Sequence, residues 1–71
     1  SPKERAELIQ ILTRMPQHIG YIIIEHDMDV ALSVSNRVTM MHNGRIFKEG
    51  VPNQIENDPE VQALYLGSGH E

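Results

Sequence analysis

The sequence predicts an α/β fold in which helices alternate with strands and two of the strands form a hairpin. The isoleucine run at positions 22–24 is typical of a strand buried on both faces, as in a parallel sheet. Asn43-Gly44 is the strongest two-residue signal for a β-hairpin. Apolar residues repeat at helical spacing earlier in the chain, at Leu8, Ile9, Leu12 and Met15. The predicted order is helix, strand, helix, β-hairpin, helix, helix.

The first helix is expected to begin at Ser1 and to stop at Pro16. Ser1 is a good N-cap, Pro2 suits the first helical position, and Glu4 has the spacing of a capping box. Pro16 ends the helix because a proline disfavours helical geometry in the residue before it. A strand over residues 21–25 follows a short connection.

A second helix is expected through residues 30–34, capped by either Asp27 or Asp29. The hairpin strands are predicted over residues 37–42 and 45–48, around the Asn43-Gly44 turn. A short helix follows at 53–56 after Pro52. Val51 lacks a capping side chain there, which costs about 1 kcal/mol, so we expect this helix to fray.

The last helix is predicted to be capped by Asp58 and to present Val61, Leu64 and Tyr65 on one face. Gly67 is a natural C-terminal stop. Residues 1–67 are therefore expected to form the folded part, and residues 68–71 a flexible tail.

Composition excludes several classes of protein. The chain has 71 residues, a formal charge of −4, no cysteine and six scattered basic residues. It has no basic stripe and only two tyrosines and one phenylalanine, so we expect no nucleic-acid partner. The longest apolar run is far shorter than the ~20 residues of a transmembrane helix, and no signal peptide is evident.

His26 is the strongest chemical candidate, because it follows a predicted strand and active sites of open parallel sheets gather where strands end. A lone histidine in such a place is usually structural or solvated. Functionally, its imidazole could donate a hydrogen bond to an anionic group, most plausibly a phosphate. The flanking Glu25 and Asp27 are then expected to hold the ring and bias its tautomer.

Other chemistry has little support from the sequence. Metal ligands typically recur at close spacing, and the histidines do not: they stand at His18, His26, His42 and His70. No metal site is therefore predicted. A Ser-His-Asp arrangement lacks the nucleophile elbow that would support it.

Several segments taken together resemble the C-terminal part of an ABC transporter ATP-binding subunit, most closely the branched-chain amino acid and urea importer group. They are Glu25-His26-Asp27-Met28 after the isoleucines, the hairpin with Ser35-Asn36-Arg37 before it, and the ending with Asn57-Asp58-Pro59 and Tyr65-Leu66-Gly67. The resemblance covers essentially the whole chain. It implies the C-terminal part of a P-loop NTPase core.

The resemblance implies a role for His26. It matches the switch histidine of the H-loop, which in this family contacts the ATP γ-phosphate and links it to the catalytic glutamate and the opposing subunit. ATP and Mg²⁺ are the cofactors implied for the intact subunit. No P-loop, signature motif or Walker B acid is present here, so this chain alone is expected neither to bind nor to hydrolyse ATP.

The resemblance also implies partners and a location. These are a second ATP-binding subunit and transmembrane permease subunits, at the cytoplasmic face of the plasma membrane. In the family's sheet, the P-loop strand separates the isoleucine strand from the first hairpin strand. Without it, open edges remain. We expect the isolated chain to close the gap, to exchange elements with or associate with a second copy, or to be partly molten.

Two readings from other classes remain open. A free-standing phosphocarrier would accept a phosphoryl group on His26 near a helix N-terminus, although acids on both sides of the histidine would repel that group. A non-catalytic interaction module would use exposed strand edges to join a partner.

Overall fold

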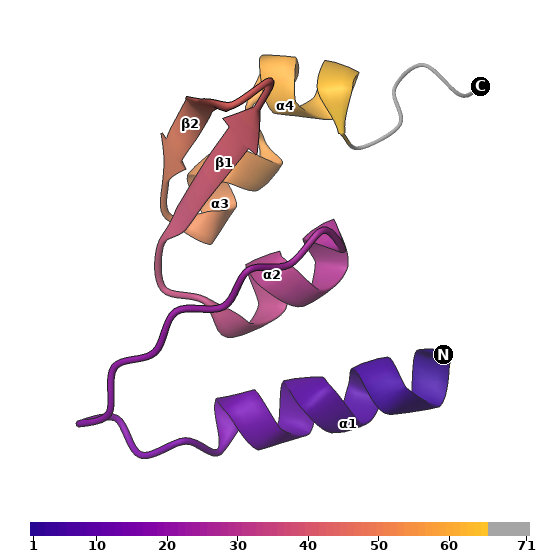
Figure 1. The fold of residues 1–71 in the computed structure, drawn as a ribbon, viewed down its shortest axis with the longest axis vertical. Coiled ribbons are helices and arrows are strands. Elements are labelled where there is room, and N and C mark those ends of the chain that lie inside the picture. The colour runs from indigo at the N-terminus through magenta and orange to yellow at the C-terminus, as the bar shows by residue number, and fades with distance from the viewer. Residues whose placement is uncertain (66–71) are drawn as a thin grey trace. The chain divides into compact units, whose positions relative to one another are not determined.

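The computed structural model describes residues 1–65 and shows four helices and a two-stranded sheet (Figure 1). The elements, in chain order, are α1 (Pro2–Thr13), α2 (Met28–Val34), β1 (Val38–His42), β2 (Arg45–Gly50), α3 (Pro52–Glu56) and α4 (Pro59–Leu64). The chain divides into two compact units, Ser1–Val34 and Ser35–Glu71, which we call the N-terminal unit and the hairpin unit. The predicted stop at Gly67 and the predicted tail at 68–71 lie outside the described residues.

Helix α1 begins as its sequence predicts. The Ser1 hydroxyl accepts a hydrogen bond from the Glu4 amide at 3.3 Å, and the Glu4 carboxylate pairs with the Ser1 ammonium group at 3.3 Å. The helix ends at Thr13, short of Pro16. None of its residues is buried, and Ile11 is 62% exposed. The N-terminal unit therefore leaves much of the apolar stripe of α1 open to solvent.

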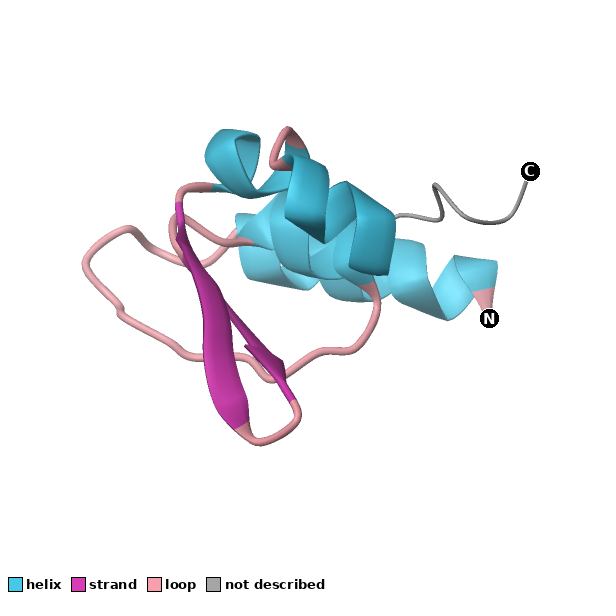
Figure 2. Ribbon diagram, turned by 90° about the horizontal axis from the view of Figure 1, so that it is seen from above, coloured by secondary structure: helices cyan, strands magenta, loops and turns pink. Residues whose placement is uncertain are grey.

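The strand predicted over residues 21–25 is not formed. Among the described residues the sheet contains only β1 and β2, and Figure 2 draws the segment between α1 and α2 as loop. Ile22 is 92% exposed and Ile24 is 99% exposed. The prediction was wrong because a strand needs a neighbour for its backbone hydrogen bonds, and no other segment within residues 1–65 supplies one.

The hairpin, in contrast, forms where the sequence predicts it. Asn43 and Gly44 both have positive φ, 53° and 76°, as a two-residue type I′ turn requires. Strand β2 runs to Gly50, two positions beyond its predicted end at Lys48. A register shift lies between Met40, which faces Lys48, and Met41, which faces Ile46, so Phe47 is the extra residue of a β-bulge.

The core of the hairpin unit lies between β1 and the two short helices. Its buried apolar side chains are Val38, Met40, Ile55 and Val61. Asp58 caps α4 as predicted, accepting from the Glu60 and Val61 amides at 2.8 and 3.1 Å. Val51 provides no side-chain cap for α3, but the Gln54 side chain accepts from the Val51 amide at 3.3 Å. The coarser prediction, an α/β chain with a hairpin, is confirmed, whereas the parallel sheet of a P-loop NTPase core is not.

Candidate functional site

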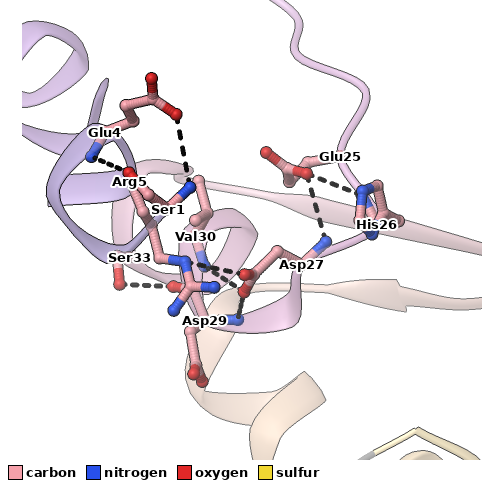
Figure 3. Close-up of polar contacts among 9 residues, drawn as sticks. All are labelled: Ser1, Glu4, Arg5, Glu25, His26, Asp27, Asp29, Val30 and Ser33. Carbon is pink, nitrogen blue, oxygen red and sulfur yellow. Dashed lines mark hydrogen bonds and ion pairs between the residues drawn. The ribbon is translucent and has the colours of Figure 1, made fainter. Parts of the chain in front are cut away.

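His26 lies in the loop that enters α2, within the N-terminal unit (Figure 3). Its side chain is exposed, and the imidazole makes no hydrogen bond or ion pair with the part of the chain that the structure describes. Both ring nitrogens are therefore available to a group from outside. The structure places His26 immediately before a helix, as the sequence predicts, but at the end of a loop rather than of a strand.

The Glu25 carboxylate folds back onto the loop. Its Oε1 atom accepts hydrogen bonds from the backbone amides of His26, at 3.0 Å, and of Asp27, at 3.2 Å. The expectation that Glu25 holds the imidazole is therefore wrong. The carboxylate takes the loop amides as its partners instead, because a side chain can hydrogen-bond to backbone groups close to it in the chain.

Asp27 is the N-cap of α2, which decides between the two predicted caps. Its Oδ1 atom accepts from the Asp29 amide at 2.9 Å and from the Val30 amide at 3.3 Å. Its Oδ2 atom lies 3.0 Å from Nε of Arg5 on α1. Like Glu25, Asp27 holds backbone and a neighbouring helix rather than the imidazole.

These groups border an open surface hollow of ≈ 220 Å³. It is lined by Ser1, Glu4, Arg5, Leu8, Glu25, His26, Asp27 and Val30. The volume is below the roughly 300–1,000 Å³ of ordinary small-molecule pockets. Three carboxylates line it, those of Glu4, Glu25 and Asp27, against the single guanidinium of Arg5. The hollow by itself therefore does not suit a free anion such as phosphate.

Sequence reasoning did not give Arg5 a role. Arg5 and Asp27 lie on different elements, so no helical or strand spacing pairs them. The only available signal in the sequence was a basic residue on the predicted first helix for which no partner was evident. Only the folded chain shows that Arg5 reaches the cap of α2.

A second polar cluster lies in the hairpin unit. Nζ of Lys48 is 3.2 Å from Oδ2 of Asp58 and 2.6 Å from Oε1 of Glu60. Its hydrogen bonds to Glu60 and then to Asp58 raise the pKa of Lys48 above its ordinary value. The Val61 amide hydrogen bond, followed by the contact with Lys48, lowers the pKa of Asp58. The cluster joins β2 to the start of α4.

An aromatic group lies next to this cluster in the same unit, where Nζ of Lys48 is 5.8 Å from the centroid of the Phe47 ring. The Tyr65 hydroxyl donates to the Met41 carbonyl at 2.9 Å and lies 3.2 Å from Nδ1 of His42. The rings of His42 and Phe47 have centroids 6.1 Å apart, and the Tyr65 ring is 6.0 Å from that of His42. These contacts fasten the end of α4 to the hairpin.

Residues 1–65 contain neither a metal-binding cluster nor a membrane-spanning helix. Within residues 1–65, no group of three or more histidine, aspartate or glutamate side chains is arranged to hold a metal ion. None of the described helices is long and apolar enough to cross a membrane.

Comparison with known proteins shows what the chain is related to. It is 35% identical over 69 residues to the high-affinity branched-chain amino acid transport ATP-binding protein LivG of Escherichia coli K12, covering 94% of this chain and 27% of LivG. Over nearly its whole length the chain is thus similar to one part of ABC transporter ATP-binding subunits. The resemblance seen in the sequence is thereby confirmed.

Other ABC transporter relatives extend the comparison. BraF of Pseudomonas aeruginosa, also a branched-chain amino acid transport ATP-binding protein, is 30% identical over 69 residues, 94% of this chain and 27% of BraF. The spermidine/putrescine import ATP-binding protein PotA of Mycoplasma capricolum is 40% identical over 72 residues, 96% of this chain and 20% of PotA. The chain thus spans about a quarter of the length of these relatives. No family model and no solved structure gives a significant match.

Proposed function

We propose that these 71 residues work as the C-terminal segment of the ATP-binding subunit of an ABC importer, of the branched-chain amino acid or urea type. The observation that carries the proposal is the match to LivG over 94% of the chain. LivG and BraF are named for branched-chain amino acid transport, whereas PotA is named for polyamine import. In this proposal residues 1–67 belong to the ATPase domain and residues 68–71 are a tail.

His26 is proposed as the H-loop switch histidine, whose imidazole N–H donates to the γ-phosphate of ATP. Its exposed ring, without a partner among residues 1–65, supports this role. His26 contributes one donor, and the sequence contains no Gly-rich phosphate-binding loop to hold the rest of the nucleotide. ATP and Mg²⁺ therefore bind the intact subunit, where the phosphate-binding loop lies outside this segment. The segment alone binds neither.

The proposed partners of the intact subunit are a second ATP-binding subunit and the transmembrane permease subunits. The proposed location is the cytoplasmic face of the plasma membrane, held there by the permease. The phosphocarrier alternative is not favoured, because the relatives that match 94–96% of this chain are all named as transport ATP-binding proteins.

The chain on its own is proposed to associate with a second copy through residues 21–25. Ile22 and Ile24 are almost fully exposed on a segment that pairs with no strand among residues 1–65, and an unpaired strand-forming segment is a template for strand pairing. An antiparallel pair centred on Ile23 places Glu25 opposite Tyr21. A parallel pair in register would instead place the two Glu25 carboxylates side by side, which is destabilising.

The test of the central proposal is the substitution His26→Ala in the full-length subunit, assembled with its permease. Removing one preorganised hydrogen-bond donor from developing charge costs about 10²–10³-fold in rate. ATP hydrolysis should fall by about that factor while nucleotide binding is kept. His18→Ala, another exposed histidine of the same unit, should hydrolyse ATP at the wild-type rate. Wild-type hydrolysis by the His26 variant would remove the switch role.

A further inference from the structure

We propose that Arg5 is a positioning residue for His26, acting through Asp27, and that Glu25 completes the brace. The inference rests on the proposed role of His26. It starts from the imidazole, which makes no hydrogen bond or ion pair with the described residues. The orientation of the ring therefore depends on the backbone of residues 25–27.

Two carboxylates hold that backbone from both sides of His26. Glu25 accepts from the amides of His26 and Asp27, while Asp27 accepts from those of Asp29 and Val30. Four backbone amides at the start of α2 thus have charged acceptors, and charge-assisted hydrogen bonds are about twice as strong as neutral ones. These bonds orient His26 with respect to α2 (Figure 3).

The bonds made by Glu25 and by Oδ1 of Asp27 are local, and they do not fix His26 with respect to α1. The Arg5 Nε to Asp27 Oδ2 contact, at 3.0 Å, supplies that connection at the end of α2 nearest His26. At the opposite end, the Tyr21 hydroxyl donates to the Val34 carbonyl at 2.9 Å and lies 3.5 Å from the Leu12 carbonyl of α1. Of these two connections between α1 and α2, the Arg5–Asp27 ion pair is the one next to His26.

Because the Arg5–Asp27 pair is exposed, its effect on the position of His26 can be distinguished from its effect on stability. The Arg5 side chain is 47% exposed and that of Asp27 is 24% exposed. An ion pair this open to solvent contributes at most about 1 kcal/mol to folding. Breaking it should therefore leave the subunit folded, whereas a 1 Å misplacement of a reacting group can cost about 10²-fold in rate.

The experiment measures ATP hydrolysis by the full-length subunit assembled with its permease. For Arg5→Gln, kcat is expected to fall about 10-fold, with KM for ATP and the melting temperature unchanged, because a modest shift costs less than a full 1 Å. Arg5→Lys should recover most of the activity. The matched control is Lys3→Gln, which removes a charge from the same helix at a residue without an ion pair among residues 1–65, and should match wild type.

Variants of the two carboxylates provide the second measurement. Glu25→Gln keeps a side-chain oxygen for the loop amides but loses the charge, so it should lower kcat less than Glu25→Ala does. Asp27→Asn keeps the cap oxygen but removes the charge that faces Arg5, so it should behave like Arg5→Gln. The double variant Arg5→Gln/His26→Ala should be no slower than His26→Ala alone, because a positioning residue acts through the residue it positions.

Two results would overturn the inference: a kcat for Arg5→Gln equal to that of Lys3→Gln, or a further loss when it is added to His26→Ala. A fall in melting temperature that accounts for the lost activity would also overturn it, by showing a merely structural role. These outcomes differ from failure of the proposed function, in which His26→Ala itself hydrolyses ATP normally.

Discussion

The two units of this chain carry similar strand-forming sequence, and only the hairpin unit turns it into strands. In the hairpin unit, Val38 and Met40 are 8% and 6% exposed. In the N-terminal unit, Ile22 and Ile24 are 92% and 99% exposed, although isoleucine favours strands as strongly as any residue. The hairpin supplies its own partner across a two-residue turn, and the isoleucine run does not. Strand formation here follows the availability of a partner more than residue preference.

The polar groups of the two units differ in the same way. In the hairpin unit, the charged side chains pair with one another and with the start of α4, so they have their partners within that unit; they are Lys48, Asp58 and Glu60. In the N-terminal unit, Glu25 and Asp27 hold the backbone around an imidazole that is left without a partner among the described residues. The polar groups of the hairpin unit therefore stabilise that unit. Those of the N-terminal unit hold the loop that carries the candidate functional group, His26.

The largest expected effect comes from making one substitution in each unit of the isolated chain. Ile55→Ala removes a side chain that is 2% exposed and should cost about 2–5 kcal/mol, enough to unfold a unit this small. Ile24→Ala removes the same atoms from a side chain that is 99% exposed and should change the free energy of unfolding by less than about 0.5 kcal/mol. Urea unfolding of dilute protein, followed by circular dichroism, measures both. Equal costs would contradict the contrast between the units.

A smaller effect is expected from pH, through Asp58 and Lys48 of the hairpin unit. Because folding lowers the pKa of Asp58, its contribution to stability is present above the ordinary value of 3.8 and is lost as pH falls through the folded pKa. Because folding raises the pKa of Lys48, its contribution is present below 10.5 and is lost as pH rises through the folded pKa. The free energy of unfolding, plotted against pH, should show two arms: a fall at acid pH caused by Asp58 and a fall at alkaline pH caused by Lys48.

Asp58→Asn is the matched variant for the pH experiment, since asparagine still caps a helix but carries no charge. Its unfolding free energy should vary less at acid pH than that of the unmodified chain. An acid arm of unchanged size in this variant would show that another carboxylate is responsible.

The structural features that could be predicted from the sequence are those that depend on residues close together in the chain. The Ser1–Glu4 capping box, the cap at Asp58 and the Asn43-Gly44 turn each depend on residues a few positions apart, and each is confirmed. The family was predictable too, because its short motifs stand in the right order, although each is weak alone.

What could not be predicted depends on partners distant in the sequence. Arg5 meets Asp27, and Tyr65 meets Met41, only once the chain has folded. The isoleucine strand was predicted wrongly for the same reason, because a pattern of apolar residues does not show whether a neighbouring strand exists. Glu25 was predicted to end that strand and to hold the imidazole, whereas it lies in a loop and its carboxylate accepts from nearby backbone amides, which compete with the imidazole.

Amide hydrogen exchange of the 71-residue chain, resolved by residue and repeated at two protein concentrations, tests the contrast between the units most directly. At the lower concentration, the amides bonded across β1 and β2 should be protected, while those of Ile22, Ile23 and Ile24 should exchange as fast as in an unstructured peptide. Protection of the isoleucines that appears only at the higher concentration would support pairing with a second copy. Protection of the isoleucines equal to that of the hairpin at the lower concentration would contradict the account.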